Sequence, residues 1–387
     1  MRQANRRPTK SLFMGEINER VDQHDVVRRI RPRNIILPVI IGLSVVLWLM
    51  LKNFDSDSLS VLVFNWRTVL YLAIAICCMV GRDLGYIIRI RILTEKDLAW
   101  RKAFRVIMLW EFTSAISPST VGGTAVAVVF IHKEGISVGR STSVVLVTSF
   151  LDELYFVVMF PLLLILIKGD NLFMSDSIMT GRPWFVNELF IIAVVGYTIK
   201  LTWVVLVGYG IFINPSGLKS LVVRIFRLPF LERWKDAAIN AGDDIVTSSR
   251  HFRTKGLKFW LRAGFTTFLS WSSRYWVANA ILVAFFAVNN HFLIFARQLV
   301  MWIMMLISPT PGGSGLAELV FTRYLSDFVP ASPEIIDSTA LAIALIWRAI
   351  SYYPYLIIGA LIAPGWVTRN FISGRRHKKI ETKPDDH

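Results

Sequence analysis

Hydrophobic residues along this chain form long runs separated by short polar and basic stretches. An α-helix rises 1.5 Å per residue, so about 20 apolar residues cross a hydrocarbon core about 30 Å thick. Runs close to or above that length occur at 34–51, 67–88, 140–168, 185–212, 258–288 and 337–363. The pattern therefore predicts an all-α integral membrane protein with about six transmembrane helices.

Proline and glycine interrupt two further apolar regions in nearly the same way. The first break lies within residues 117–123 and the second within residues 308–313. Proline removes a backbone donor, and unpaired peptide groups at membrane depth cost several kcal/mol unless they line a protein-enclosed cavity. We therefore expect hinges beside a substrate site at Pro118, Gly122, Gly123, Pro309, Pro311, Gly312 and Gly313.

The helical arms beside these breaks are short. Residues 101–116 and 124–133 flank the first break, and residues 292–308 and 314–326 flank the second. The shorter arms reach only about 15 to 20 Å, which favours two re-entrant hairpins that enter and leave on one side. Chance recurrence of helix-breaking loops is the alternative interpretation. If the hairpins enter from opposite sides, they form an inverted repeat, which is typical of transporters.

Basic residues favour one membrane orientation. With the amino terminus in the cytoplasm, the leader 1–33, the connector 214–258 and the tail 366–387 all face inward, and they are rich in Lys and Arg. We expect a multi-pass protein of the cell inner (plasma) membrane with both termini cytoplasmic. The net charge of +16 then indicates attraction to anionic inner-leaflet lipids and not to nucleic acid. Residues 218–227 fit a basic amphipathic helix on that leaflet or a solvated connector.

Composition supports a membrane protein, since 54% of the residues are hydrophobic and the mean hydropathy is +0.52. The cysteines, Cys77 and Cys78, are adjacent in an apolar run and suggest neither a disulfide framework nor a metal site. No HExxH, GxSxG or Walker motif occurs. We therefore expect no enzyme activity, no catalytic residues, no metal and no cofactor.

Ionisable residues inside the apolar segments are the candidate substrate-binding groups. A charge at the bilayer centre costs from about 2.5 to more than 10 kcal/mol, so these side chains should face the protein interior. Both signs together suit a head group with phosphate and amine. Structural ion pairs are the alternative, and a structural pair or snorkelling is the preferred interpretation for Lys200. The candidates are Arg82, Asp83, Glu111, Asp152, Glu153, Arg274, Glu318 and Arg348.

The broken motifs resemble a known family. Residues 117–123, followed by Arg140 and the Asp152-Glu153 pair, and residues 309–315 with Glu318, resemble the transmembrane domain of lysylphosphatidylglycerol synthases. That domain also occurs alone in "flippase-like" membrane proteins. The resemblance extends from about residue 34 to residue 365.

The family resemblance implies movement of an aminoacylated phosphatidylglycerol, or of another lipid or lipid carrier, between leaflets. It also implies that Glu318, Asp152 and Glu153 line the lipid path. The soluble aminoacyl-transferase domain of the full synthases is missing, so we expect this chain not to make the lipid.

Together these observations predict a lipid flippase or translocator for a phospholipid, including an aminoacylated one, or for a lipid-linked substrate. Two other classes stay open. A membrane-embedded transferase would use Asp152, Glu153 or Glu318 on a lipid donor, whereas a regulatory membrane subunit would need none of the buried charges. The sequence leaves the oligomeric state undetermined.

Overall fold

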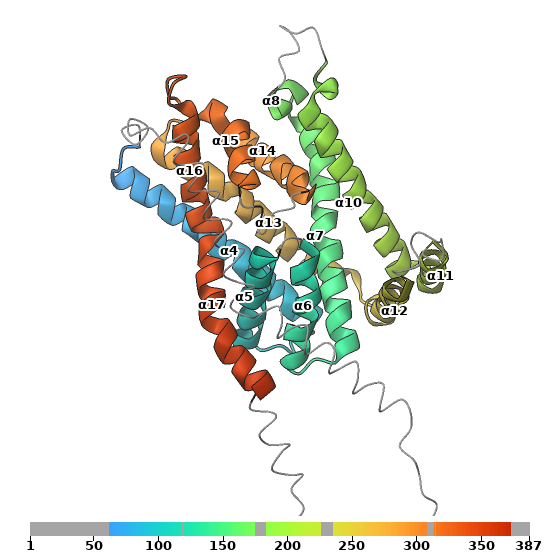
Figure 1. The fold of residues 1–387 in the computed structure, drawn as a ribbon. Coiled ribbons are helices and arrows are strands. Elements are labelled where there is room, and N and C mark those ends of the chain that lie inside the picture. Colours follow the sequence, from blue (N-terminus) through green and yellow to red (C-terminus); the bar gives the residue numbers. More distant parts are fainter. Residues whose placement is uncertain are drawn as a thin grey trace, which may run out of the picture.

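The computed structural model describes residues 62–117, 120–174, 183–225, 235–307, 313 and 315–372, and these ranges contain helices and no strands (Figure 1). The predicted span 34–51 and leader 1–33 lie outside the described residues. So do the predicted hinges Pro118, Pro309, Pro311 and Gly312, and the tail beyond residue 372.

Helices α4 (Trp66–Leu93) and α13 (Leu257–Phe285) pack along each other at the centre of the bundle. The side chain of Asn65 starts α4 by accepting a hydrogen bond from the Thr68 backbone N–H at 3.0 Å. A Cβ atom at Gly85 would lie 2.9 Å from the Thr266 carbonyl oxygen. Only glycine therefore permits this close approach of the two helices.

Helices α7 (Val138–Leu166) and α10 (Glu188–Phe212) form a second packed pair beside this centre (Figure 1). The short helices α8 (Gly169–Phe173) and η1 (Trp184–Val186) lie between them in the sequence. Because α10 has apolar residues on all sides, it can expose one face to lipid while it packs on α7 with the other.

The first broken region folds as an antiparallel hairpin of α5 (Trp100–Ile116) and α6 (Thr120–Lys133). At its tip Gly123 contacts Ser114, and a Cβ atom at Gly123 would lie 2.8 Å from the Ser114 Cα atom. At its base the Lys102 ammonium donates to the Glu134 carbonyl at 2.8 Å. The predicted break between two helical arms is therefore present, and Gly123 permits their contact.

The second broken region folds in the same way. Helix α14 (His291–Met304) continues into η3 (Met305–Ile307), and the chain returns through α15 (Leu316–Leu325) and η5 (Ser326–Phe328). At the base Arg297 donates to the Tyr324 carbonyl at 3.0 Å. Figure 1 places α14 and α15 in the upper half of the molecule and α5 and α6 in the lower half, so the hairpins approach the centre from opposite ends.

The last apolar run does not form the single helix 337–363 that its length predicts. It divides into α16 (Ile336–Ser351) and α17 (Tyr353–Val367), stacked end to end in Figure 1. Pro354 lies in the first turn of α17, where a proline starts a helix readily but cannot continue one. Tyr352 forms the joint with φ of −132° and ψ of −55°.

The connector after α10 contains two helices, α11 (Pro215–Ile225) and α12 (Lys235–Phe252), where the sequence predicts one short helix. Leu218 of α11 is buried, and close contacts of Gly210 place it beside Ile245 of α12. Leu221 stays exposed. Part of the amphipathic face therefore packs on the protein itself.

Four described segments are long and apolar enough to cross a membrane: α4, α7, α10 and residues 336–370. Helix α13 spans 29 residues but carries buried polar side chains, including Thr266, Ser270 and Asn279. These polar side chains lower the mean hydropathy of α13. They are buried where α13 packs against other helices.

Candidate functional site

A cavity of about 530 Å³ lies where the tips of the two hairpins meet α4, α7, α13 and the joint between α16 and α17. This volume is within the range of about 300 to 1,000 Å³ that small-molecule sites occupy. The first hairpin contributes Ser114, Ala115, Ser117 and Thr124, and the second contributes Met305, Leu306, Gly313 and Ala317.

The tip of the first hairpin is attached to the joint of the last two helices. The Tyr352 hydroxyl donates a hydrogen bond of 3.1 Å to the Ala115 carbonyl. This carbonyl belongs to the last turn of α5, which has no following turn to satisfy it. The residue at the joint between α16 and α17, which the sequence interpretation missed, therefore supplies a hydrogen-bond donor for the end of α5 beside the first break. The Tyr353-Pro354 dipeptide was the available signal.

The tip of the second hairpin depends on glycine conformations. Gly313 has φ of +68° and Gly315 has φ of +85°, a region that side chains with a Cβ atom rarely adopt. The Gly315 N–H donates to Glu318 Oε2 at 2.7 Å, which satisfies a free donor at the start of α15. Gly313 also lies against the Met305 methyl group, so a larger residue would meet both strain and a clash.

Arg82 of α4 joins two carboxylates. Its guanidinium lies 2.8 Å from Asp83 and 2.5 Å from Glu111 of the first hairpin. The Tyr355 hydroxyl lies 2.9 Å from both Asp83 oxygens. Arg82 is 1% exposed, so it needs a carboxylate to offset its lost hydration. Glu111 lines the cavity, whereas Asp83 does not.

Arg89, two turns further along α4, binds Asp152 of α7 with both terminal nitrogens, at 2.5 and 3.1 Å. The indole N–H of Trp271 also donates to Asp152, at 2.6 Å. The guanidinium carbons of Arg82 and Arg89 both lie 4.7 Å from the Tyr86 ring centroid. Arg82, Tyr86 and Arg89 lie on one face of α4, so both guanidinium groups stack on the Tyr86 ring.

Two further ion pairs connect α7 to α10 and the second hairpin to α16. Lys200 binds Glu153 at 2.5 Å, so of the two interpretations preferred for this lysine the structure shows the ion pair. Arg348 Nε binds Glu318 Oε1 at 2.8 Å, and both side chains are buried. Arg348 and Lys200 line the cavity, whereas Glu318 lies behind it.

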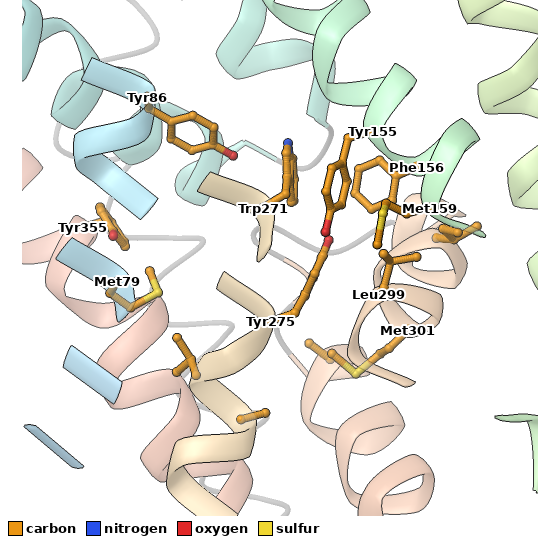
Figure 2. Packing of buried hydrophobic residues seen from close by; sticks show 14 of the residues in the cluster. Met79, Tyr86, Tyr155, Phe156, Met159, Trp271, Tyr275, Leu299, Met301 and Tyr355 are labelled. Atoms are coloured by element: carbon orange, nitrogen blue, oxygen red, sulfur yellow. The ribbon is translucent and has the colours of Figure 1, made fainter. Parts of the chain in front are cut away.

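Aromatic rings form one wall of the cavity. Figure 2 shows Trp271 between Tyr86 on one side and Tyr155 and Phe156 on the other. The rings of Trp271 and Tyr155 are stacked with centroids 6.3 Å apart, and Phe156 meets Trp271 edge-on at 4.8 Å. This packing fixes the indole N–H that holds Asp152.

Six of the eight predicted substrate-binding residues line the cavity. Asp83 and Glu318 do not line the cavity, but each forms an ion pair with an arginine that does. The sequence interpretation omitted Trp302 and Phe156, since aromatic residues in apolar helices give no signal that separates a cavity wall from core. Of the predicted hinges within the described residues, Gly313 lines the cavity, Gly123 packs against the cavity-lining Ser114, and Gly122 belongs to α6.

A second charged cluster lies at one end of the bundle, where α4 ends and α7 begins. Glu95 binds Lys255 at 2.8 Å and Arg140 at 3.5 Å. The hydrogen bond from Lys255 and the nearby positive charges lower the pKa of Glu95. Burial and the charge of Arg140 lower the pKa of His251. These contacts tie the loop after α4 to α7 and to the segment between α12 and α13.

Long apolar helices around a cavity lined by charged side chains define a multi-pass helical membrane protein. The profile of the family described as "Lysylphosphatidylglycerol synthase TM region" matches residues 35–359, so the chain belongs to this family. This confirms the resemblance drawn from the broken motifs. The chain is also similar to a "UPF0104 membrane protein" of Archaeoglobus fulgidus, with 27% identity over 310 residues, 77% of this chain and 86% of the relative. No solved structure matches significantly.

Proposed function

We propose that this protein moves a phospholipid or a lipid-linked substrate between the leaflets of the membrane and leaves it chemically unchanged. The observation that carries this proposal is the charged cavity at the meeting point of two hairpin tips. In many transporters the substrate site lies near the bilayer midplane, between two repeats and beside interrupted helices. The family of the chain supports the same class of substrate.

The proposed topology has six spans and two re-entrant hairpins of opposite orientation, related as an inverted repeat. In this topology the end of the bundle that holds the base of the first hairpin faces the cytoplasmic side of the cell inner (plasma) membrane. Lys102, Arg105, Arg140 and Lys255 gather at this end, as cytoplasmic loops require. Anionic inner-leaflet lipids are the proposed partners of this basic surface.

The ion pairs favour transport over chemistry at the cavity. A lipid transferase would need an available carboxylate as base or nucleophile. Asp152 accepts three hydrogen bonds from Arg89 and Trp271, and Glu153 is held by Lys200. These contacts occupy carboxylate oxygens that a general base or nucleophile would need. The same pairs keep the polar wall nearly neutral, which favours passage of a head group through an apolar medium.

A proteoliposome assay tests the proposal. Fluorescent phospholipid in the inner leaflet becomes accessible to an external quencher only after it crosses the membrane. We expect purified protein to accelerate this movement, and Ala115→Phe to slow it by filling the cavity beside the first tip. Leu361→Phe is the matched control, because Leu361 is 77% exposed on the outer face of α17.

The outcomes separate the classes. Equal rates for Ala115→Phe and the unmodified protein would contradict passage through this cavity. Absence of any protein-dependent movement would contradict the proposed function and favour a regulatory subunit. A chemically altered lipid recovered from the vesicles would favour the transferase.

A further inference from the structure

Arg274 of α13 differs from the other basic side chains of the cavity. Arg82, Arg89, Lys200 and Arg348 each lie within 2.8 Å of a carboxylate oxygen. Within the part of the chain that the structure describes, no carboxylate lies within 4.0 Å of Arg274 and no hydrogen bond involves its guanidinium. An arginine inside an apolar bundle needs an anion to offset its lost hydration.

Two tryptophans hold the Arg274 guanidinium in place. Its central carbon lies 4.2 Å from the ring centroid of Trp302 and 5.8 Å from that of Trp271. Both rings line the cavity with Arg274. Stacking of this kind restrains the planar group but uses none of its five N–H donors. A restrained guanidinium with free donors fits a phosphate, which it can bind with two parallel hydrogen bonds.

On the first hairpin, Glu111 is part of a local excess of negative charge. It shares the single guanidinium of Arg82 with Asp83, so two carboxylates surround one cation. The Tyr355 hydroxyl donates to Asp83. Among the described residues Arg82 is the one group that forms an ion pair or hydrogen bond with the Glu111 carboxylate, and the Glu111 side chain is 23% exposed and lines the cavity. Glu111 can therefore accept hydrogen bonds from an added ammonium group.

The surrounding charges sum to zero. Every basic side chain that lines the cavity has a counterpart among the acids that line or back it, once Arg274 is set against the surplus carboxylate at Arg82. Arg274 and Glu111 both line the cavity but form no ion pair with each other, because their charged atoms lie more than 4.0 Å apart. A ligand that satisfies both without leaving a net charge in the cavity carries one negative and one positive group.

We propose that the cavity selects a zwitterionic lipid head group, with its phosphodiester on Arg274 and its primary amine on Glu111. This assignment rests on the proposed function, since it takes the ligand to be a lipid. It narrows the substrate class to lipids with one phosphodiester and one ammonium group. An ethanolamine phospholipid and a monoamino acyl ester of phosphatidylglycerol both have this chemistry.

Binding to the purified full chain tests the assignment without requiring translocation. Native mass spectrometry measures occupancy by short-chain lipids: dihexanoyl phosphatidylethanolamine, its N-acetyl derivative and dihexanoyl phosphatidylglycerol. We expect the first to bind roughly ten- to a hundredfold more tightly than the other two, because each loses the contact to Glu111. Equal binding of all three would overturn the proposal. The alanyl ester of phosphatidylglycerol is measured in the same way. Whichever of the two zwitterionic lipids, this ester or phosphatidylethanolamine, binds more tightly is identified as the preferred ligand.

Two variants separate the phosphate and amine contacts. Arg274→Gln should weaken binding of phosphatidylethanolamine and of its N-acetyl derivative alike. Glu111→Gln should weaken only the former, so the preference between them disappears. Arg262→Gln is the matched control, because Arg262 is an exposed arginine on the same helix. If Arg274→Gln does not fold, Arg274→Lys keeps the charge without the planar fork and should bind with intermediate affinity.

Unchanged binding in the Arg274 variants, or equal losses for both lipids in Glu111→Gln, would overturn the assignment. The failure of the proposed function gives a different result. Selective binding without protein-dependent lipid movement would contradict the flippase and keep the ligand assignment. Lipid movement without head-group selectivity would support the flippase and contradict the ligand assignment.

Discussion

Glu318 of α15 fixes Arg348 of α16 by accepting from its Nε at 2.8 Å, and the second Glu318 oxygen accepts from the Gly315 backbone N–H at 2.7 Å. One carboxylate therefore joins the tip of the second hairpin to the helix that leads into the joint at Tyr352. Because Glu318 is 1% exposed and lies behind the cavity wall, its contribution is to position Arg348.

We predict that Glu318→Gln lowers stability by about 3 to 5 kcal/mol, because it leaves Arg348 as a buried charge without its carboxylate. Thermal unfolding in detergent measures the change. Replacing both partners, as in Glu318→Gln with Arg348→Met, should recover part of the loss. Glu334→Gln, at an exposed acid before α16, is the control. A single variant as stable as the original chain would contradict the positioning role.

Gly123 permits the contact at the tip of the first hairpin, since a Cβ atom there would lie 2.8 and 2.9 Å from the Cα and N atoms of Ser114. We predict that Gly123→Ala separates α5 from α6 and slows lipid movement in proteoliposomes, and that Gly123→Val does so more strongly. Membrane insertion should change less, because the apolar character of the arms is kept.

Gly264→Ala is the control for this substitution. Gly264 lies in α13 with no neighbouring atom within 4 Å of an added Cβ, so alanine there should be neutral or stabilise by about 0.4 to 1 kcal/mol. Equal lipid movement by Gly123→Val and Gly264→Ala would remove the reason to treat the first break as functional.

The orientation of the bundle predicts a labelling pattern. In a chain with Cys77 and Cys78 replaced by alanine, we expect Ser216→Cys to react with an impermeant maleimide only from the cytoplasm. We expect Ser332→Cys to react from outside. Both serines are exposed, in α11 and in the loop before α16. External labelling at residue 216 would contradict the re-entrant arrangement, because it would place the basic connector outside.

Asp244 of α12 predicts a pH dependence of stability. Burial, with a smaller contribution from the charge of Asp243, raises the pKa of Asp244 from 3.8 to about 6. A folded-state pKa above the unfolded value means that ionisation opposes folding. The penalty is absent below pH 3.8, develops as the pH rises through about 6 and is complete above it.

Asp244→Asn should therefore raise the melting temperature more at pH 8 than at pH 5, measured against the unmodified chain at each pH. Glu334→Gln is the control, because Glu334 is an exposed carboxylate outside α12. A gain for Asp244→Asn that is larger at pH 5 would show that the sign is wrong.

Much of this architecture is contained in local sequence signals. Apolar runs of helical length predict α4, α7 and α10, and proline and glycine predict the breaks near Ser117 and Gly313. These signals are reliable because membrane insertion and backbone hydrogen bonding depend on consecutive residues. The same logic predicted that the buried charges face inward, since lipid offers them no solvation.

The sequence also contains a third helix break, at Tyr352, which the length of the apolar run did not predict. Tyr353-Pro354 divides the last apolar run, yet a proline in the first turn of a helix gives no sign of whether the preceding residues continue straight. The hydrogen bond from the Tyr352 hydroxyl at this joint to the Ala115 carbonyl of the first hairpin is visible only in the tertiary structure.

The sequence by itself determined that this is an all-helical membrane protein with interrupted helices and buried charges of both signs. Only the tertiary structure decided which charges neutralise one another. Arg89 meets Asp152 across 63 positions of sequence, and Arg348 meets Glu318 across 30, whereas Arg274 meets tryptophan rings. Such pairings follow from how whole helices pack, and helical periodicity fixes only the face on which a side chain lies.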